Sequence, residues 1–399
     1  MPPKSPRNPK VPKVCSRADR WFVAAWSPFF QPRGLFQLDA PPGDRIQSAP
    51  ALDEFFTLLY LTAAFDVVCR GHRTMAALGR RPGRFFVEAA PLILSRSSAD
   101  SITVHTPAKV NLFFEVLAKR DDGFHEIDTI MCPIDVYDTL LFHDDRSGRI
   151  QLTCERASGP LCSTSDSCRA TDSGLPTGQD NLVVRAIELL QREAGVAGGA
   201  SVRLIKRIPI ASGLGGGSSD AAAALVAGNA VWRLGLDWGT LARLASRLGS
   251  DVPFFLAGGA AVCRGRGERI EPIAGLSGWH LVVARPSQGL STAAVYRRCR
   301  PAERPRSHEL LREAFDRGDV AGAGCRLFNR LQAPASALSP WIDEMAARFT
   351  RLDLPGHVMS GSGTSYFGLC RHAGHARRVA RGLYASGIGS VFAARTCRN

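Results

Sequence analysis

The stretch GLGGGSSDAAAAL, residues 213–225, sets four glycines, two serines and an aspartate directly before a block of alanines. The residues before it, SVRLIKRIPI (201–210), alternate as a strand does, and alanine is the best helix former. A glycine-rich turn between a strand and a helix lets backbone N–H groups approach an anion, and the helix dipole favours negative charge there. The stretch therefore predicts a phosphate-binding loop, and the plainer alternative is a linker or tight turn.

Three familiar phosphate-binding signatures do not fit this loop. No lysine follows the glycines, as the GxxxxGK loop requires, and Ser218 stands where a GxGxxG dinucleotide loop needs its third glycine. The HRD and DFG signatures of protein kinases are missing from the sequence. The loop therefore belongs to another class of phosphate site.

The composition narrows the class of protein. A chain of 399 residues with 45% hydrophobic content can form two or three globular domains. Its net charge of +14 predicts an anionic partner, which is nucleic acid, anionic lipid or a phosphorylated small molecule. The 11 cysteines show no CxxC pair, which argues against a disulfide scaffold or zinc site and indicates reduced thiols in a cytosolic setting.

Residues 1–99 read as a basic, partly disordered N-terminal extension, because their opening MPPKSPRNPKVPK is rich in proline and lysine. They are a targeting segment, a nucleic-acid-binding arm or, as we favour, a tail without function, with translation beginning for instance at Met75. The longest apolar run, 55–69, is interrupted by Asp66 and is too short to cross a bilayer. We therefore expect no transmembrane segment.

Regular structure is expected from residue 101 onward. Hydrophobic alternation predicts strands, and apolar residues at helical spacing predict helices, one beginning at Asn181 and one ending at Gly249. The expected strands are 101–116, divided by a turn at Pro107, and 131–145, 149–155, 201–210, 280–286 and 365–370; the expected helices are 181–195, 240–248 and the alanine helix. Residues 159–178 read as a polar loop.

Four motifs flank the glycine loop in a fixed order. They are TPAKVNLFFEV (106–116), DDGFHEIDTIM (121–131), GSDVPFFLAGGAAVCRGRGE (249–268) and SGSGTSYFGL (360–369). Together with PIASGLGGGSSDAAAAL (209–225), they resemble the GHMP kinases, the superfamily of galactokinase, homoserine kinase, mevalonate kinase and phosphomevalonate kinase. Within it they are most similar to the branch that acts on a cytidine-diphosphate-linked methylerythritol.

The resemblance implies an α+β, two-domain GHMP kinase fold. A ribosomal S5-like domain over 100–270 would hold the phosphate loop and the catalytic residues, and a ferredoxin-like domain over 271–399 would follow. The implied reaction is ATP-dependent phosphorylation of the 2-hydroxyl of the methylerythritol unit in isoprenoid (terpenoid) biosynthesis, with Mg²⁺. The implied location is the cytoplasm, or a plastid if the extension is a targeting segment, with no nucleic-acid or membrane partner; the oligomeric state stays open.

Two alternatives to this function remain at the level of sequence. A sister kinase for homoserine or mevalonate would share the phosphate loop but not the GFHEI motif. A basic nucleic-acid-binding protein would need aromatic residues interleaved with a basic patch, whereas the positive charges of this chain are scattered.

Two residues carry the expected chemistry. Lys109 is a lone cation in an apolar stretch, which favours an anionic partner because a buried ammonium is costly, although its stem could also reach the surface. Asp251 lies just before Pro253 and suits a general base or a helix N-cap. The resemblance makes Asp251 the general base, places Lys109 beside the transferring phosphoryl group, and has Asn111 hold the substrate.

The resemblance also implies a cytosine site. Phe124, where many relatives have tyrosine, would stack on the base, and His125 would read its edge. Tyr296 would be the second stacking ring, with Thr292 close by. Without the resemblance, Phe124 reads as a core residue and His125 as a solvated turn residue.

The nucleotide site is expected at the loop and two flanking segments. Asn181, Leu182 and Lys206 would lie near adenine, although Asn181 reads equally as a helix N-cap and Lys206 as a strand-surface cation. The loop residues expected to contact ATP are Pro209, Ile210, Ala211, Ser212, Gly213, Leu214, Gly215, Gly216, Gly217, Ser218 and Ser219. For Mg²⁺, the candidates Ser218, Ser219 and Asp220 stay open.

Three further segments bear on the site. The small-residue loop 361–364 is expected to face it from the second domain. Arg330 and Gln332 replace the acids of an Asn-Asp-Leu-Glu segment found in many relatives, which leaves the role of Asn329 open. The stretch 154–178 has no assigned role.

Overall fold

The computed structural model of the protein describes residues 92–157, 174–276 and 278–397. The basic extension up to residue 91, the apolar run 55–69 and most of the expected loop at 159–178 lie outside the described residues. A strand, β1 (Ile93–Ser98), lies on the N-terminal side of the domain boundary expected at residue 100.

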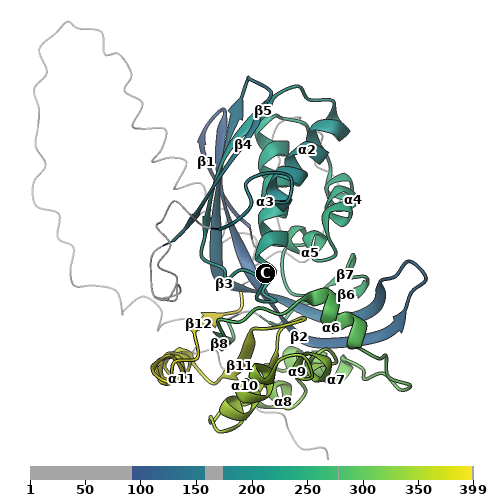
Figure 1. The fold of residues 1–399 in the computed structure, drawn as a ribbon, viewed down its shortest axis with the longest axis vertical. Helices are drawn as coiled ribbons and strands as arrows, with labels where there is room; N and C mark the ends of the chain where they lie inside the picture. The colour runs from purple at the N-terminus through teal and green to yellow at the C-terminus, as the bar shows by residue number, and fades with distance from the viewer. Residues whose placement is uncertain (1–91, 158–173, 277, 398–399) are drawn as a thin grey trace, which may run out of the picture. The chain divides into compact units, whose positions relative to one another are not determined.

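An eight-stranded sheet supports the glycine loop (Figure 1). Its main order is β1, β2 (Ser101–Lys119), β3 (His125–Asp145), β5 (Gly199–Lys206) and β4 (Ile150–Arg156). The long strands β2 and β3 pair antiparallel along most of their length, and β4 pairs with β5 in parallel. The expected strand at 201–210 therefore ends at Lys206, and the remaining residues belong to the loop.

The turn expected at Pro107 is wrong, because β2 continues through this proline as one strand. The pairing of β2 with β3 shifts register between Pro107 and Ala108. A bulge of this kind accommodates a residue that has no N–H to donate to the ladder. Lys109 and Asn111 therefore lie on a continuous strand rather than beside a turn.

Three short strands complete this sheet. β6 (Ala261–Gly265) pairs with β3 and with β7 (Arg269–Pro272). β9 (Phe328–Asn329) comes from much later in the chain and pairs in parallel with β2. β9 therefore ties the C-terminal part of the chain to the strand that carries Lys109.

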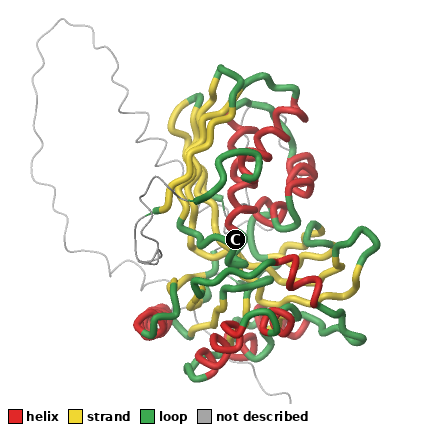
Figure 2. Tube along the Cα trace, in the orientation of Figure 1, coloured by secondary structure: helices red, strands yellow, loops and turns green. Residues whose placement is uncertain are grey.

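Helices cover one face of the upper part of the sheet (Figure 2). α3 (Gly216–Val231) lies against β2 and β3, and its alanines 221–224 are fully buried. α2 (Leu182–Ala194), α4 (Trp238–Leu248) and α5 (Val252–Leu256) pack around α3. The small alanine side chains let α3 approach the sheet closely, which fixes the glycine loop at its N-terminus.

A second sheet of four antiparallel strands forms the C-terminal lobe. Its order is β10 (Gly356–Met359), β11 (Tyr366–Cys370), β8 (His280–Arg285) and β12 (Ser390–Arg395). In chain order these strands lie 2-3-1-4, and every neighbouring pair is antiparallel. The helices of this lobe are α6 (Thr292–Arg298), α7 (Glu309–Asp316), α8 (Val320–Gly324), α9 (Gln332–Ser336), α10 (Pro340–Thr350) and α11 (Ala373–Ala385).

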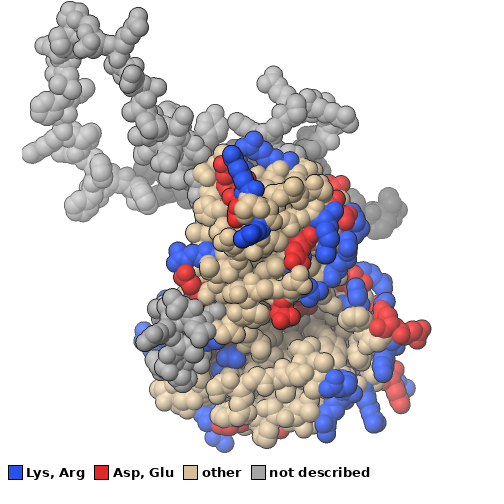
Figure 3. All heavy atoms as spheres, turned by 45° about the horizontal axis from the view of Figure 1, so that its top comes forward, with Lys and Arg blue, Asp and Glu red and all other residues tan. Residues whose placement is uncertain are grey.

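The surface charges, the cysteines and the hydropathy of the helices show no unusual feature among the described residues. On the face drawn in Figure 3, basic and acidic side chains are interspersed. Every cysteine that the structure describes is a free thiol. Among the described helices, none has the length and apolar character needed to span a membrane.

Candidate active site

The glycine loop fits only because its glycines lack side chains. Gly213 and Gly215 have φ values of +77° and +73°. A Cβ at Gly213 would overlap the carbonyl oxygen of Ser360, and one at Gly215 would lie 2.9 Å from Phe255 Cζ and 3.0 Å from Lys109 Cγ. The loop is therefore pressed between Lys109 and the C-terminal lobe.

A cavity of about 350 Å³ opens between this loop and the N-terminus of α2. All residues expected to contact ATP line it, except Leu214 and Ser219, which are buried. The Leu214 carbonyl accepts a hydrogen bond from Lys109 N (2.9 Å), and the Ser219 hydroxyl donates one to Pro107 O (2.7 Å). These two residues fasten the loop and the start of α3 to β2.

Five further residues line the cavity that the sequence reading did not assign to ATP: Leu175, Pro176, Asp180, Leu204 and Asp220. Leu204 could have been identified from the sequence, because side chains alternate along β5 and Leu204 therefore lies on the same face as Lys206. Leu175 and Pro176 come from a loop without periodicity, so no pattern in the sequence marks them.

Asn181 caps α2, as one of its two sequence readings predicts. Its side-chain oxygen accepts a hydrogen bond from Val183 N (2.9 Å), while its amide donates to Pro176 O (2.8 Å). The amide also lies 3.9 Å from Cys154 Sγ. The residue therefore joins the edge of the cavity to the first turn of α2.

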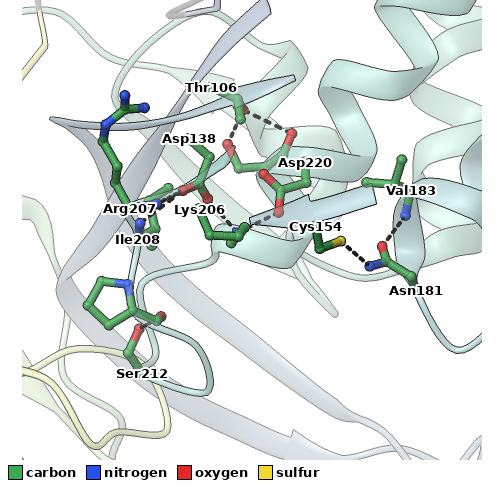
Figure 4. A network of polar contacts seen from close by, with 12 residues as sticks. Thr106, Asp138, Cys154, Asn181, Val183, Lys206, Arg207, Ile208, Ser212 and Asp220 are labelled. Atoms are coloured by element: carbon green, nitrogen blue, oxygen red, sulfur yellow. Dashed lines mark hydrogen bonds and ion pairs between the residues drawn. The ribbon is translucent and has the colours of Figure 1, made fainter. Parts of the chain in front are cut away.

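Lys206 is buried next to the loop, between the carboxyl groups of Asp138 and Asp220 (Figure 4). Its Nζ contacts Asp138 Oδ2 and lies 2.5 Å from Asp220 Oδ2. Asp138 Oδ1 also accepts hydrogen bonds from the backbone N–H groups of Arg207 (2.5 Å) and Ile208 (2.9 Å). The reading of Lys206 as a surface cation is wrong, because only the alternation of β5 and not its burial was visible in the sequence.

Asp220 is the most perturbed carboxyl of this cluster. Burial raises its pKa to about 8, although the neighbouring Lys206 ammonium acts in the opposite direction. Its Oδ1 atom is buried with no hydrogen-bond partner among the described residues. Burial lowers the pKa of Lys206, but the two carboxylates outweigh it and the net shift is upward.

The expected catalytic residues meet on the other side of the loop. Lys109 Nζ lies 3.4 Å from Asp251 Oδ2 and donates a hydrogen bond to Asn111 Oδ1 (2.7 Å). Lys109 is 3% exposed, so its ammonium is buried as the sequence indicates. Asp251 stands at the N-cap position of α5 but makes no side-chain capping bond there, and about a third of its side chain is exposed.

Asn111 is itself held in place. Its amide donates to Thr129 Oγ1 (2.9 Å), and the Thr129 hydroxyl donates to Phe113 O (2.6 Å). Thr129 was not identified from the sequence, because only the pairing of β2 with β3 brings it near Asn111.

The loop 360–365 of the C-terminal lobe closes over this pair. Ser360 Oγ accepts a hydrogen bond from Asn111 N (3.3 Å) and donates one to Gly213 O (3.2 Å). Ser365 N donates to Ser212 O (3.0 Å). The loop therefore contacts both the phosphate loop and the strand with Lys109.

Of the residues expected at cytosine, His125 and Tyr296 lie close together. The His125 and Tyr296 rings are 5.1 Å apart between centroids, and Phe114 packs behind Tyr296 at 6.5 Å. Phe124 is half exposed, with the Arg266 guanidinium 4.7 Å from its ring centroid. Thr292 begins α6 and its hydroxyl lies 2.8 Å from Ser362 Oγ.

Known proteins resemble this chain over the part that holds the two lobes and the site. The family models of the GHMP kinases N-terminal and C-terminal domains match residues 181–259 and 311–389. A protein of Pelotomaculum thermopropionicum named 4-diphosphocytidyl-2-C-methyl-D-erythritol kinase is 41% identical over 70% of this chain and 92% of its own length. One of Synechococcus sp. with the same name is 42% identical over 68% of this chain and 90% of its own.

Solved structures agree on the fold. The crystal structure of a 4-(cytidine 5'-diphospho)-2C-methyl-D-erythritol kinase matches with a TM-score of 0.60 at 36% identity, covering 74% of this chain and 100% of that one. A homoserine kinase from Cytophaga hutchinsonii matches with a TM-score of 0.57 at 20% identity, covering 76% and 98%. The second likeness supports the two-domain fold alone.

Proposed function

This chain belongs to the family of 4-diphosphocytidyl-2-C-methyl-D-erythritol kinases, and we propose that it phosphorylates the 2-hydroxyl of that alcohol with Asp251 and Lys109 at the reacting centre. As a GHMP kinase it takes the phosphoryl group from ATP, and its reaction belongs to isoprenoid biosynthesis. The observation that carries the residue assignment is the Lys109–Asp251 pair beside the phosphate loop, at 3.4 Å.

Asp251 is the proposed general base. Because its carboxylate is not used as a helix cap and is partly exposed, an oxygen is free to accept the proton of an incoming hydroxyl. The alcohol oxygen then attacks the γ-phosphorus, the bond to the ADP oxygen breaks, and the proton stays on Asp251. Asn111, fixed by Thr129, holds the attacking alcohol next to the pair.

Lys109 is the proposed electrostatic partner of the transferring group. Its stem lies against Gly215 of the phosphate loop and its ammonium lies beside Asp251. A buried positive charge at this point stabilises the negative charge that develops between the donor and acceptor oxygens.

ATP is proposed to lie in the 350 Å³ cavity. The backbone N–H groups of 215–217 and the N-terminus of the 16-residue helix α3 suit the phosphates. Asn181, Leu182 and Lys206 line the same cavity and are proposed to lie near adenine.

Mg²⁺ is proposed to arrive with ATP. It prefers oxygen ligands and usually takes them from substrate phosphates with one or two protein groups. Ser219 is engaged in packing against β2, whereas Ser218 lines the cavity and the Oδ1 atom of Asp220 is without a hydrogen-bond partner among the described residues. These two oxygens fit the ion, which would neutralise phosphate charge.

The cytidine end of the substrate is proposed to lie at His125, Phe124 and Tyr296, with Thr292 at its edge. Burial, helped by the charge of Lys119, lowers the pKa of His125, which favours the neutral ring. A neutral imidazole has one donor and one acceptor nitrogen, which matches the mixed edge of cytosine.

We further propose that the catalytic unit comprises two domains divided near residue 270, in β7, and that the extension before β1 is not needed for catalysis. The working location is the cytoplasm, with a small-molecule substrate and no nucleic-acid partner.

The test is ADP release with ATP, Mg²⁺ and 4-diphosphocytidyl-2-C-methyl-D-erythritol, beside homoserine and mevalonate, for the wild type and for Asp251→Asn. The matched control is Asp237→Asn, which changes another N-cap aspartate, on α4. We expect turnover of the cytidyl substrate alone, a loss of about 10²-fold or more in Asp251→Asn, and normal rates in the control. Turnover of another alcohol in its place would refute the substrate assignment, and an active Asp251→Asn would refute the base.

A further inference from the structure

Asn329, the second residue of β9, holds the loop over the catalytic pair. Its amide nitrogen donates two hydrogen bonds, to Met359 O (2.7 Å) and to Gly361 O (2.7 Å). Its side-chain oxygen accepts one from Leu331 N (2.9 Å), and the residue is buried. Both donor positions of the amide are therefore used on the backbone of one short segment.

That segment touches the proposed reacting centre. The two bonds from Asn329 lie on either side of Ser360, whose hydroxyl joins Asn111 N to Gly213 O. A Cβ at Gly361 would lie 3.4 Å from Lys109 Nζ and 3.3 Å from Asn111 Oδ1. The backbone that Asn329 holds therefore forms the wall against which the lysine ammonium rests.

Asn329 is itself held on β2 by an ion pair. β9 pairs with β2 so that Asn329 faces Phe114, and Arg330 N donates to Phe114 O (2.8 Å). The Arg330 guanidinium then forms two hydrogen bonds to the fully buried Glu115 carboxylate, at 2.6 and 2.8 Å.

The Glu115 carboxylate has further partners that keep it charged. Burial raises its pKa, but the Arg330 guanidinium and the backbone N–H groups of Arg306 and Val116 outweigh burial, so the net pKa is lowered. The guanidinium groups of Arg306 and Arg330 both lie over the Phe328 ring, 4.3 and 5.1 Å from its centroid. A buried, ionised Glu115 thus meets a partly exposed Arg330 in a two-pronged contact, which fixes the register of β9.

We propose that Asn329 is a positioning residue for phosphoryl transfer: braced on β2 by the Glu115–Arg330 pair, it fixes Ser360 and Gly361 over Lys109 and so holds the ammonium at Asp251. This inference rests on the proposed function. Lys109, Asn111 and Glu115 lie on the same strand, so the brace and the chemistry share one support. The Arg330 that departs from the family pattern thus has a defined partner, and Gln332 accepts a hydrogen bond from Met359 N (3.1 Å), at the end of β10 just before this loop.

The test is Asn329→Asp, which keeps the size and the acceptor for Leu331 N but replaces two donors with an oxygen facing two carbonyls. The matched control is Asn229→Asp, because the Asn229 side chain likewise bridges a loop, bonding Leu236 N and Leu236 O at 3.0 and 3.1 Å. We expect kcat to fall 10- to 100-fold in Asn329→Asp with the KM for ATP changed less than about twofold, since misplacement of about 1 Å costs up to 10²-fold. The control should keep the wild-type kcat.

A purely structural role predicts a different result. It would lower the unfolding midpoint of both variants while leaving kcat per folded molecule unchanged, and that outcome for Asn329→Asp overturns the proposal. If Asn329→Asp does not fold, the proposal is tested with Arg330→Lys, which keeps a charge next to Glu115 but loses the two-pronged contact. The proposal then requires the same selective loss of kcat in Arg330→Lys. Should Asp251→Asn remain active, the proposed base assignment fails; should Asp251→Asn be inactive while Asn329→Asp keeps its kcat, this inference alone fails.

Discussion

The close fit of the phosphate loop against the C-terminal lobe can be tested with three glycine-to-alanine variants. Gly217→Ala places a Cβ 3.8 Å from Leu182 Cδ1 at an ordinary helical φ. Gly195→Ala, at the C-cap of α2, has φ +64° and open space around the new Cβ. Gly213→Ala combines φ +77° with overlap of the Ser360 carbonyl, so the series separates the cost of the backbone conformation from the cost of the contact.

The magnitudes follow from these differences. Gly217→Ala should leave stability unchanged or raise it by up to about 1 kcal/mol, because alanine is the better helix former. Gly195→Ala should cost about 1–2 kcal/mol for the left-handed conformation. Gly213→Ala should add about 1–3 kcal/mol more for overpacking, since Ser360 cannot retreat easily: its N–H and carbonyl are bonded to Ser365 O (2.9 Å) and Gly363 N (3.0 Å).

The assay is urea unfolding, with midpoints compared at constant slope, alongside kcat and the KM for ATP. We expect Gly213→Ala to be the least stable and to lose ATP affinity as well. If Gly213→Ala were no less stable than Gly195→Ala, the contact between the phosphate loop and Ser360 would be disproved, and with it the closure of the site by the second lobe.

Three further predictions concern the ionised and aromatic groups. The pKa of Asp220 is raised in the folded state, so the folded protein keeps a proton that the unfolded chain releases at lower pH. The stability of the wild type relative to Asp220→Asn should therefore fall as pH rises from about 4 to about 8 and level off at higher pH, which urea unfolding midpoints measured across this pH range would show. Arg330→Met leaves the buried Glu115 carboxylate without its main partner and should cost about 3–5 kcal/mol, most of it recovered in the double variant Glu115→Gln/Arg330→Met; no recovery would mean that the charge is not the cause. His125→Ala and Tyr296→Ala should each raise the KM for the cytidyl substrate about tenfold and leave the KM for ATP unchanged in steady-state kinetics, whereas equal effects on both would place these rings elsewhere.

Local signals predicted the elements near the phosphate loop well. The N-cap Asn181, the apolar spacing of α2 and α4 and the stop at Gly249 depend on neighbours within one or two turns, and the structure confirms them. The turn expected at Pro107 failed because proline usually interrupts a strand, and only the bulge against β3 accommodates it here.

Most of the support for the site lies beyond local pattern. Asp138 reaches Lys206 across 68 residues, and Arg330 reaches Glu115 across 215, because sheet pairing brings distant segments together. No periodicity links such pairs. Sequence resemblance identified Lys109 and Asp251, but the residues that hold them could be found only from the fold.

The two buried lysines beside the phosphate loop show how the same residue type is given different tasks. Lys206 lies between the carboxylate of Asp138 and the carboxyl group of Asp220, and all three groups are almost inaccessible, so its charge is neutralised within the protein and serves to fasten α3 to β3 and β5. Lys109 has one carboxylate partner, at a longer 3.4 Å, and that carboxylate is a third exposed. The charge of Lys109 is therefore the less neutralised of the two, and an incoming phosphate competes for it on better terms. Lys206 thus holds the helix that follows the phosphate loop, whereas Lys109 is placed to interact with ATP.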